Sequence, residues 1–83
     1  MKVTVRYFAS LRERLGASEI VEATPGSSVG AVRDALIARG GEHAAALARG
    51  RAVRSALDQV LCDDAAVVGE GAELAFFPPV TGG

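Results

Sequence analysis

The chain has 83 residues, of which 49% are hydrophobic and 23% charged, and this balance favours one small folded domain over a disordered segment. Nine basic and ten acidic side chains give a net charge of −1. That charge argues against a nucleic-acid partner, because nucleic-acid-binding proteins usually present a basic face. No apolar run approaches the roughly 20 residues needed to cross a bilayer, so no membrane partner is expected.

The beginning of the chain and its cysteine content predict a cytoplasmic protein. Residues 1–7 alternate in polarity, whereas a secretory signal would place a continuous apolar stretch there. Cys62 is the single cysteine and cannot form an internal disulfide, which fits a reducing compartment.

The first third of the chain predicts two strands joined by a short helix. Residues 2–8 alternate in polarity and indicate a strand that buries one face. Residues 10–13 form a Ser-Leu-Arg-Glu capping box, and Gly16 is suited to end the helix that the box would start. Residues 19–23 are β-branched at their centre and predict a second strand, the hairpin partner of the first.

The middle of the chain predicts helices. Ser28 can cap a helix that runs to about Arg39, because apolar residues from Val29 onward follow the 3.6-residue period. Gly40 and Gly41 would stop this helix, and the alanine-rich residues 42–48 predict one or two further helical turns.

The last third predicts strands and an extended exit. Residues 53–61 indicate one strand, or two short strands broken near Asp58 and Gln59, and residues 63–72 form a loop that would bury its Val67-Val68 pair. Residues 73–77 predict the last strand, which Pro78 and Pro79 end because proline lacks the backbone donor of a sheet. This order of elements favours an α+β fold, a mixed sheet with a helix packed across one face.

The chain lacks the usual groups of an enzyme that works alone. With one histidine, His43, and one cysteine, Cys62, it cannot build a common zinc site, and we expect neither a metal nor a stably bound cofactor. No phosphate-binding glycine loop is present, and the spacing of His43 and Cys62 does not indicate a catalytic pair.

The end of the printed sequence carries the strongest functional signal. After two prolines, which favour an extended exit, come Val80, Thr81, Gly82 and Gly83. Glycines lack a Cβ and can enter a channel too narrow for other residues, and a terminal glycine carboxylate is sterically open to activation as an acyl-adenylate. The alternative is an inert, glycine-rich terminus on an interaction module.

The whole chain resembles the ubiquitin-like β-grasp sulfur carriers, and most closely the family of the small subunit of molybdopterin synthase, the MoaD family. The resemblance implies a β-grasp domain over residues 1–77 and a flexible, extended tail over residues 78–83, with the first and last strands as central neighbours. The residues that carry it are the ending Ala75-Phe76-Phe77-Pro78-Pro79-Val80-Thr81-Gly82-Gly83, supported by the opening residues 3–9 and 11–16.

The resemblance also implies a cycle between partners. An adenylyltransferase of the ubiquitin-activating (MoeB) type would consume ATP to adenylate Gly83, and a sulfur donor protein would convert the adenylate to a thiocarboxylate. The large synthase subunit (MoaE type) would then receive the sulfur for cyclic pyranopterin monophosphate, in molybdenum cofactor biosynthesis. The carrier would donate sulfur within the synthase complex without being catalytic by itself.

Site residues follow from this resemblance and from the strand pattern. Gly83 would carry the adenylate and thiocarboxylate, and residues 80–82 (Val80, Thr81 and Gly82) would thread into the partner. Exposed aromatic side chains beside a reactive tail favour docking, because aromatics dominate interface energy. We expect the partner-binding residues to be Phe8, Leu61, Ala75, Phe77, Pro78, Pro79 and Arg12.

Two alternatives stay open at this point. A related carrier of the same fold can serve thiamin, cysteine or thiolated-tRNA synthesis, or protein conjugation. A non-catalytic interaction module with an inert tail is the alternative from a different class.

Overall fold

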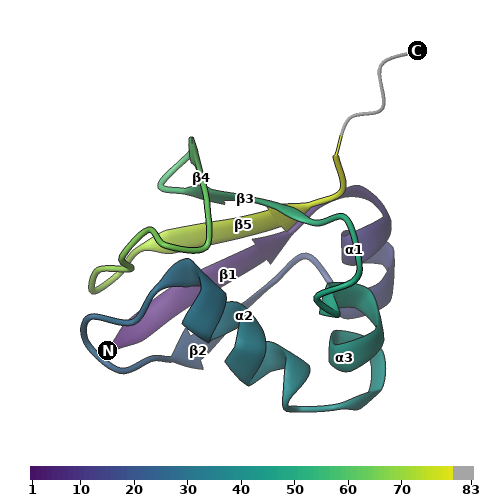
Figure 1. Ribbon diagram of the computed structural model, residues 1–83, viewed down its shortest axis with the longest axis horizontal. Helices are drawn as coiled ribbons and strands as arrows, with labels where there is room; N and C mark the ends of the chain where they lie inside the picture. Colours follow the sequence, from purple (N-terminus) through teal and green to yellow (C-terminus); the bar gives the residue numbers. More distant parts are fainter. Residues whose placement is uncertain (80–83) are drawn as a thin grey trace.

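The computed structural model describes residues 1–79 and forms one mixed sheet with helices on one of its faces (Figure 1). Within these residues the sheet has five strands in the order β2-β1-β5-β3-β4. This arrangement confirms the α+β prediction and is that of a ubiquitin-like β-grasp fold. The elements in chain order are β1 (Lys2–Tyr7), α1 (Ala9–Leu15), β2 (Ser18–Glu22), α2 (Val29–Ile37), α3 (Gly41–Leu47), β3 (Arg54–Leu57), β4 (Val60–Cys62) and β5 (Glu73–Phe77). None of the helices in the described part of the chain is long and apolar enough to cross a membrane.

The first and last strands lie side by side at the centre of the sheet. β1 and β5 are parallel, with Tyr7 opposite Phe76, while β5 is antiparallel to β3. β2 pairs antiparallel with β1, and α1 connects the two strands, both as predicted.

The core lies between the sheet and the helices. The alternation predicted for β1 is confirmed, because Val3, Val5 and Tyr7 are all buried, and in β5 the same is true of Leu74 and Phe76. Helix residues that follow the 3.6-residue period close this core from the other side, and they include Val29, Val32, Leu36 and Leu47.

α2 begins where the sequence predicted. The Oγ of Ser28 accepts a hydrogen bond from the backbone N–H of Ala31 at 3.1 Å, which satisfies one of the free donors at a helix start. The helix ends at Ile37, two residues before the predicted Arg39.

The predicted capping box at residues 10–13 is wrong. α1 begins at Ala9, so Ser10 lies inside the helix, and the residue at the cap position is Phe8, which makes no side-chain cap. The backbone carbonyl of Phe8 instead accepts hydrogen bonds from Leu11 and Arg12. Gly16 ends the helix as predicted: its φ of 94° is one that glycine adopts easily, and its N–H donates to the carbonyl of Arg12.

The break near Asp58 and Gln59 is a tight turn between β3 and β4, where both residues have positive φ. Asp58 Oδ1 accepts from the N–H of Glu73 at 3.0 Å, which ties the turn to the start of β5. The expectation that Val67 and Val68 are both buried is half wrong. Val68 is buried, but Val67 is 63% exposed, because neighbouring residues in an extended segment point in opposite directions.

Candidate functional site

Most of the described residues that were predicted for the site lie at the C-terminal end of β5 or on the face of the sheet that carries no helix. We call this face the open face. Val80, Thr81, Gly82 and Gly83 lie outside the described residues. Pro78 and Pro79 directly follow β5 and are half-buried. Because β5 is a central strand, the chain leaves the sheet between β1 and β3.

Strand register brings two of the predicted docking residues into one row across the open face. Ala75 lies opposite Arg6 of β1 on one side and Ala56 of β3 on the other. Ala56 in turn lies opposite Leu61 of β4, which is 62% exposed. Small side chains at the centre of the row leave the sheet surface accessible, while Leu61 offers apolar area at its edge.

Phe77 and Phe8 complete the predicted docking residues of the sheet. Phe77 lies two residues beyond Ala75 on β5, so it shares the open face, and its cross-strand neighbour is Arg54. Both phenylalanines are half-buried, so the pair is less exposed than the sequence predicted. The guanidinium of Arg6 covers part of the Phe8 ring, and its Cζ lies 5.1 Å from the ring centroid.

Arg6 is a member of the site that the sequence pattern did not single out. Its Nη1 donates to Glu73 Oε1 at 3.0 Å, while its guanidinium lies over Phe8. The side chain therefore links β1 to β5 and holds the Phe8 ring against the sheet, a cation–π contact. In the sequence the signal would have been the i, i+2 spacing of Arg6 and Phe8 on one strand face.

Basic side chains gather near the exit of β5. Pro78 lines a hollow of about 320 Å³ together with Leu11, Arg14 and Arg51. Arg14 also pairs with Glu42 at 2.9 Å, which fixes α1 against α3. Arg12, the cation predicted to contact a partner, is exposed on α1.

The groups considered for catalysis have structural partners. His43 Nε2 lies 2.7 Å from Glu19 Oε2, and Cys62 Sγ lies 3.7 Å from the Ser55 hydroxyl oxygen. His43 belongs to α3 and Cys62 to β4, so the two side chains lie in separate environments. Among residues 1–79, no group of three or more His, Cys, Asp or Glu side chains is arranged to hold a metal ion.

Glu19 organises a polar cluster at the start of β2. Its carboxylate accepts from the Tyr7 hydroxyl at 2.8 Å and pairs with Arg39 as well as His43. Burial alone would raise the pKa of Glu19. The hydrogen bonds with Arg39, His43 and Tyr7 outweigh burial and lower that pKa to about 2. The pKa of the Tyr7 hydroxyl is raised well above its usual range, first by burial and then by its bond to Glu19.

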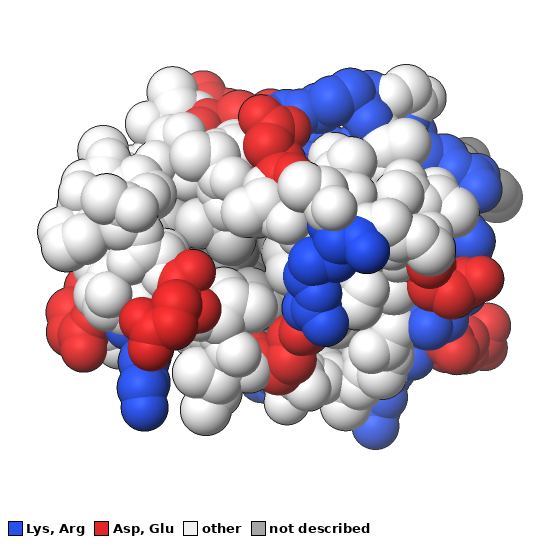
Figure 2. Space-filling view, turned by 90° about the horizontal axis from the view of Figure 1, so that it is seen from below, with Lys and Arg blue, Asp and Glu red and all other residues white. Residues whose placement is uncertain are grey.

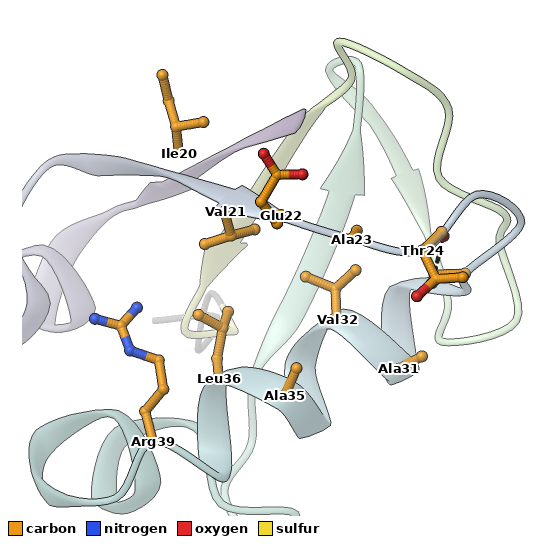
Figure 3. A pocket seen from close by; sticks show the side chains of 11 residues that line it. Ile20, Val21, Glu22, Ala23, Thr24, Ala31, Val32, Ala35, Leu36 and Arg39 are labelled. Carbon is orange, nitrogen blue, oxygen red and sulfur yellow. Dashed lines mark hydrogen bonds between the residues drawn. The ribbon is translucent and has the colours of Figure 1, made fainter. Parts of the chain in front are cut away.

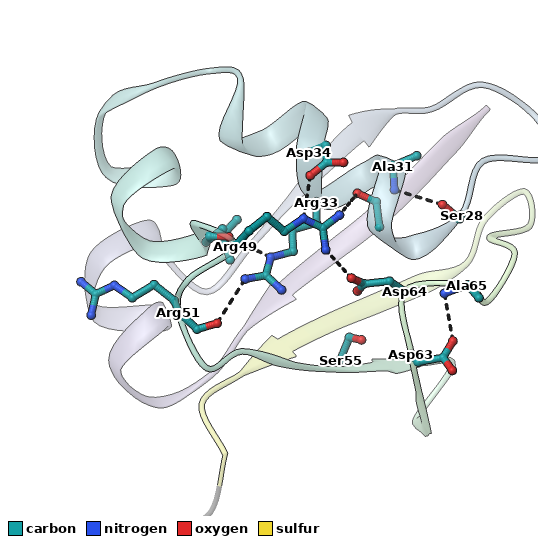
Figure 4. A network of polar contacts seen from close by, with 12 residues as sticks. Ser28, Ala31, Arg33, Asp34, Arg49, Arg51, Ser55, Asp63, Asp64 and Ala65 are labelled. Carbon is teal, nitrogen blue, oxygen red and sulfur yellow. Dashed lines mark hydrogen bonds and ion pairs between the residues drawn. The ribbon is translucent and has the colours of Figure 1, made fainter.

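A second polar network fixes the segment that leads to β3 (Figure 4). Arg33 of α2 is buried, and its guanidinium donates to the backbone carbonyls of Leu47 and Ala48, each at 2.8 Å. Arg49 pairs with Asp34 at 2.9 Å and with Asp64. These bonds hold α2, the end of α3 and the loop after β4 together, and so support the sheet from the helix side.

Comparison with known proteins adds to this geometry. The model of the ThiS family matches residues 5–83. A molybdopterin synthase sulfur carrier subunit from Haemophilus influenzae is 38% identical over 81 residues, which cover 98% of this chain and 99% of that protein.

Solved structures give the same fold. The small archaeal modifier protein 1 of Haloferax volcanii has a TM-score of 0.78 and 25% identity, over 95% of this chain and 98% of that one. A subunit from a complex of subunits 1 and 2 of the molybdopterin-converting factor of Helicobacter pylori has a TM-score of 0.70 and 24% identity, over the full length of both chains. At 24% identity, the likeness to the Helicobacter pylori subunit establishes the fold alone.

Proposed function

The chain belongs to the ThiS family, and from this premise we propose that it is the sulfur carrier subunit of a molybdopterin synthase, with the carboxylate of Gly83 as its working group. The observation that carries the proposal is the match to a sulfur carrier subunit of that synthase over 98% of this chain. The family match also extends through Gly82 and Gly83, the residues on which the chemistry depends.

The proposed cycle has two covalent steps at Gly83. A carboxylate oxygen attacks the α-phosphorus of ATP on an activating enzyme, pyrophosphate leaves, and an acyl-adenylate forms. A sulfur donor protein then supplies the equivalent of HS⁻, which attacks the acyl carbon and displaces AMP to leave a thiocarboxylate. Glycine favours both steps, because it has no side chain to hinder the approach to its carboxyl group.

The partners supply the catalytic groups in this proposal. The only histidine and cysteine of the chain, His43 and Cys62, are engaged with Glu19 and Ser55. ATP would be consumed by the activating enzyme of the MoeB type, and the large subunit of the MoaE type would bind the pterin substrate. The role of this chain is to present its end to both enzymes.

Docking of the large subunit is proposed on the open face and the adjoining exit. Leu61, Ala75 and Phe77 would supply the apolar contact, and Phe8 would extend it along β1. Arg12, Pro78 and Pro79 would flank the point at which residues 80–82 (Val80, Thr81 and Gly82) enter the partner. The parallel for such a pairing is the Helicobacter pylori structure, which is a complex of subunits 1 and 2 of a molybdopterin-converting factor.

Intact-mass spectrometry tests the proposed chemistry. Incubation with ATP, an activating enzyme of the family and a sulfur source is expected to raise the mass by about 16 Da, as one sulfur replaces one oxygen. The matched control lacks Gly83 and is expected to gain nothing. Full loading of the control would place the reactive group elsewhere, and no gain by the intact chain would reject the sulfur-carrier function.

A second candidate function is conjugation of Gly83 to a protein amine. It is favoured by the likeness to a small archaeal modifier protein, with a TM-score of 0.78. The two functions share the adenylate and differ in the nucleophile that follows. Mass spectrometry of tryptic digests from the cells that make this protein distinguishes them. The last Lys or Arg of the chain is Arg54, so conjugation leaves residues 55–83 attached to lysines of other proteins, whereas sulfur transfer leaves no such adduct.

A further inference from the structure

β2 is an outer strand of the sheet, and among the described residues it pairs with β1 alone. Met1 and Ala23 exchange two backbone hydrogen bonds of 2.8 Å. This pair shows which residues of β2 direct their backbone groups toward β1 and which direct them away. In an antiparallel pair, hydrogen-bonded residues alternate with residues whose backbone groups point to the other side. The N–H and C=O groups of Ile20 and Glu22 therefore point away from β1, toward solvent.

A groove runs along this edge, between β2 and α2, and has a volume of about 540 Å³. Figure 3 shows that Val21, Val32 and Leu36 point into it, whereas Ile20 and Glu22 stand on the opposite side of the strand. The helix side also carries two exposed alanines, Ala31 and Ala35, whose small side chains keep the groove open. The side chains that point into the groove from β2 and α2 are thus aliphatic, and they lie beside a row of backbone donors and acceptors.

The guanidinium of Arg39 lies at one end of the groove (Figure 3). Its side chain is 50% exposed, and only its Nη1 is used in the ion pair with Glu19, as far as residues 1–79 are concerned. The remaining guanidinium N–H groups can donate to an incoming carboxylate. Figure 2, which views this side of the molecule, shows a recess in a largely uncharged surface, with both Lys or Arg atoms and Asp or Glu atoms near it.

We propose that the β2 edge and this groove bind an extended peptide segment of a partner protein, which adds to the sheet as a further strand. The unpaired backbone groups of Ile20 and Glu22 supply the main-chain hydrogen bonds, and alternate aliphatic side chains of the peptide enter the groove. An acidic residue of the peptide lies at the Arg39 end. This surface is distinct from the open face and the exit of β5.

A second copy of this chain does not meet these requirements. If two β2 strands paired, the side chains entering the partner's groove would be those on the helix side of β2, which are Glu19 and Val21. Glu19 is the carboxylate that would have to approach Arg39 of the other copy, but it is already bonded to Tyr7, Arg39 and His43 of its own chain. The N–H groups of Arg39 that Glu19 does not use therefore favour a foreign segment with a free carboxylate.

Nuclear magnetic resonance titration of the ¹⁵N-labelled full chain tests the proposal. The probes are two capped peptides of about seven residues, the length of a strand, in which valine alternates with threonine and an aspartate stands at the first or the last position. Saturable shifts and slowed hydrogen exchange are expected at the N–H groups of Ile20 and Glu22. The better of the two peptides fixes the strand direction, and replacing its aspartate with asparagine is expected to weaken binding about threefold.

Two pairs of variants locate the site. Ala35→Glu places bulk and negative charge in the groove and is expected to abolish binding, whereas Ala38→Glu, an exposed change at the end of the same helix, is expected to leave binding intact. Ile20→Pro removes the outward N–H without removing a bond to β1, and Ile20→Thr keeps that donor, so only the first is expected to block the peptide.

The proposal is overturned if neither peptide gives saturable shifts at β2, or if Ala35→Glu binds as well as Ala38→Glu. It is also overturned if the free protein is a dimer by light scattering that Ile20→Pro converts to a monomer, because a second copy would then cover the edge.

Discussion

Protonation of Glu19 is expected to remove a polar cluster that ties β2 to α2 and α3. One carboxylate accepts from the Tyr7 hydroxyl at 2.8 Å and contacts His43 Nε2 at 2.7 Å, while it also pairs with Arg39. Burial acts to raise the pKa of this carboxyl, but the three hydrogen-bonded partners outweigh burial and hold the pKa at about 2, against 4.5 as the ordinary value. The side chain is 23% exposed, so solvent screens the cluster only in part.

The difference between 4.5 and about 2 corresponds to about 3 kcal/mol of folding stability. Because the pKa of Glu19 is lower in the folded than in the unfolded chain, this contribution is complete above the unfolded pKa. It is lost progressively as the pH falls from about 4.5 toward 2.

Urea denaturation of the wild-type chain and of Glu19→Gln, from neutral pH down to pH 2, measures this contribution. The free energies of unfolding are expected to differ most at neutral pH and to converge by about 3 kcal/mol as the pH approaches 2. Other carboxyl groups titrate in both proteins and cancel in the difference. Glu42→Gln is the control, because Glu42 forms an exposed ion pair with Arg14 that is worth less than about 1 kcal/mol. Curves for wild type and Glu19→Gln that stay parallel over this range would refute the assignment.

Three further outcomes are expected. Deleting Gly83 is expected to abolish the gain of sulfur by mass spectrometry while the melting temperature stays nearly constant, because the buried core lies within residues 3–76; a large loss of stability would contradict this. Phe77→Ala is expected to weaken binding of the large subunit about tenfold in calorimetry, and unchanged affinity would remove Phe77 from the docking face. Arg33→Met is expected to lower the free energy of unfolding, measured by urea denaturation, by about 2–3 kcal/mol, because the carbonyls of Leu47 and Ala48 lose their donor. A loss near zero would show that water replaces the guanidinium.

The strands of this fold could be read from the sequence because burial and alternation coincide in them. Val3, Val5 and Tyr7 repeat every second residue in β1, and all three are buried. The helix start at Ser28 was equally readable, because a cap is a local interaction between a side chain and a backbone N–H three residues away.

Predictions failed where a distant contact decides the local structure. Ser10 has the right neighbours for a cap, but the Phe8 carbonyl accepts the bonds that begin α1, and Phe8 is itself held by its N–H bond to the Phe76 carbonyl of β5. Val67 is apolar, yet its pairing with Ser28 turns the side chain outward. Neither contact can be predicted from the residues that neighbour Ser10 or Val67 in the sequence.

The candidate site also contains some residues that the sequence predicted and others that only the packed fold reveals. Leu61 and Ala75 were chosen from strand patterns, and the strand register places them in one row of the open face. The role of Arg6 depends on two partners, Phe8 and Glu73, of which the second is 67 residues away in the chain. The groove beside β2 is formed by two elements whose sequences each look ordinary, so it becomes visible only when they are packed together.

The central place of β5 has a mechanical consequence. β5 is bonded to β1 on one side and to β3 on the other, with Tyr7 and Arg54 flanking its last residues. A pull along the strand loads both rows of hydrogen bonds in shear, so many must break at once, whereas a strand at the border of a sheet can be peeled off one bond at a time. A partner that pulls on the chain beyond Phe77 therefore loads a strand that is held on both sides, which resists unfolding of the domain.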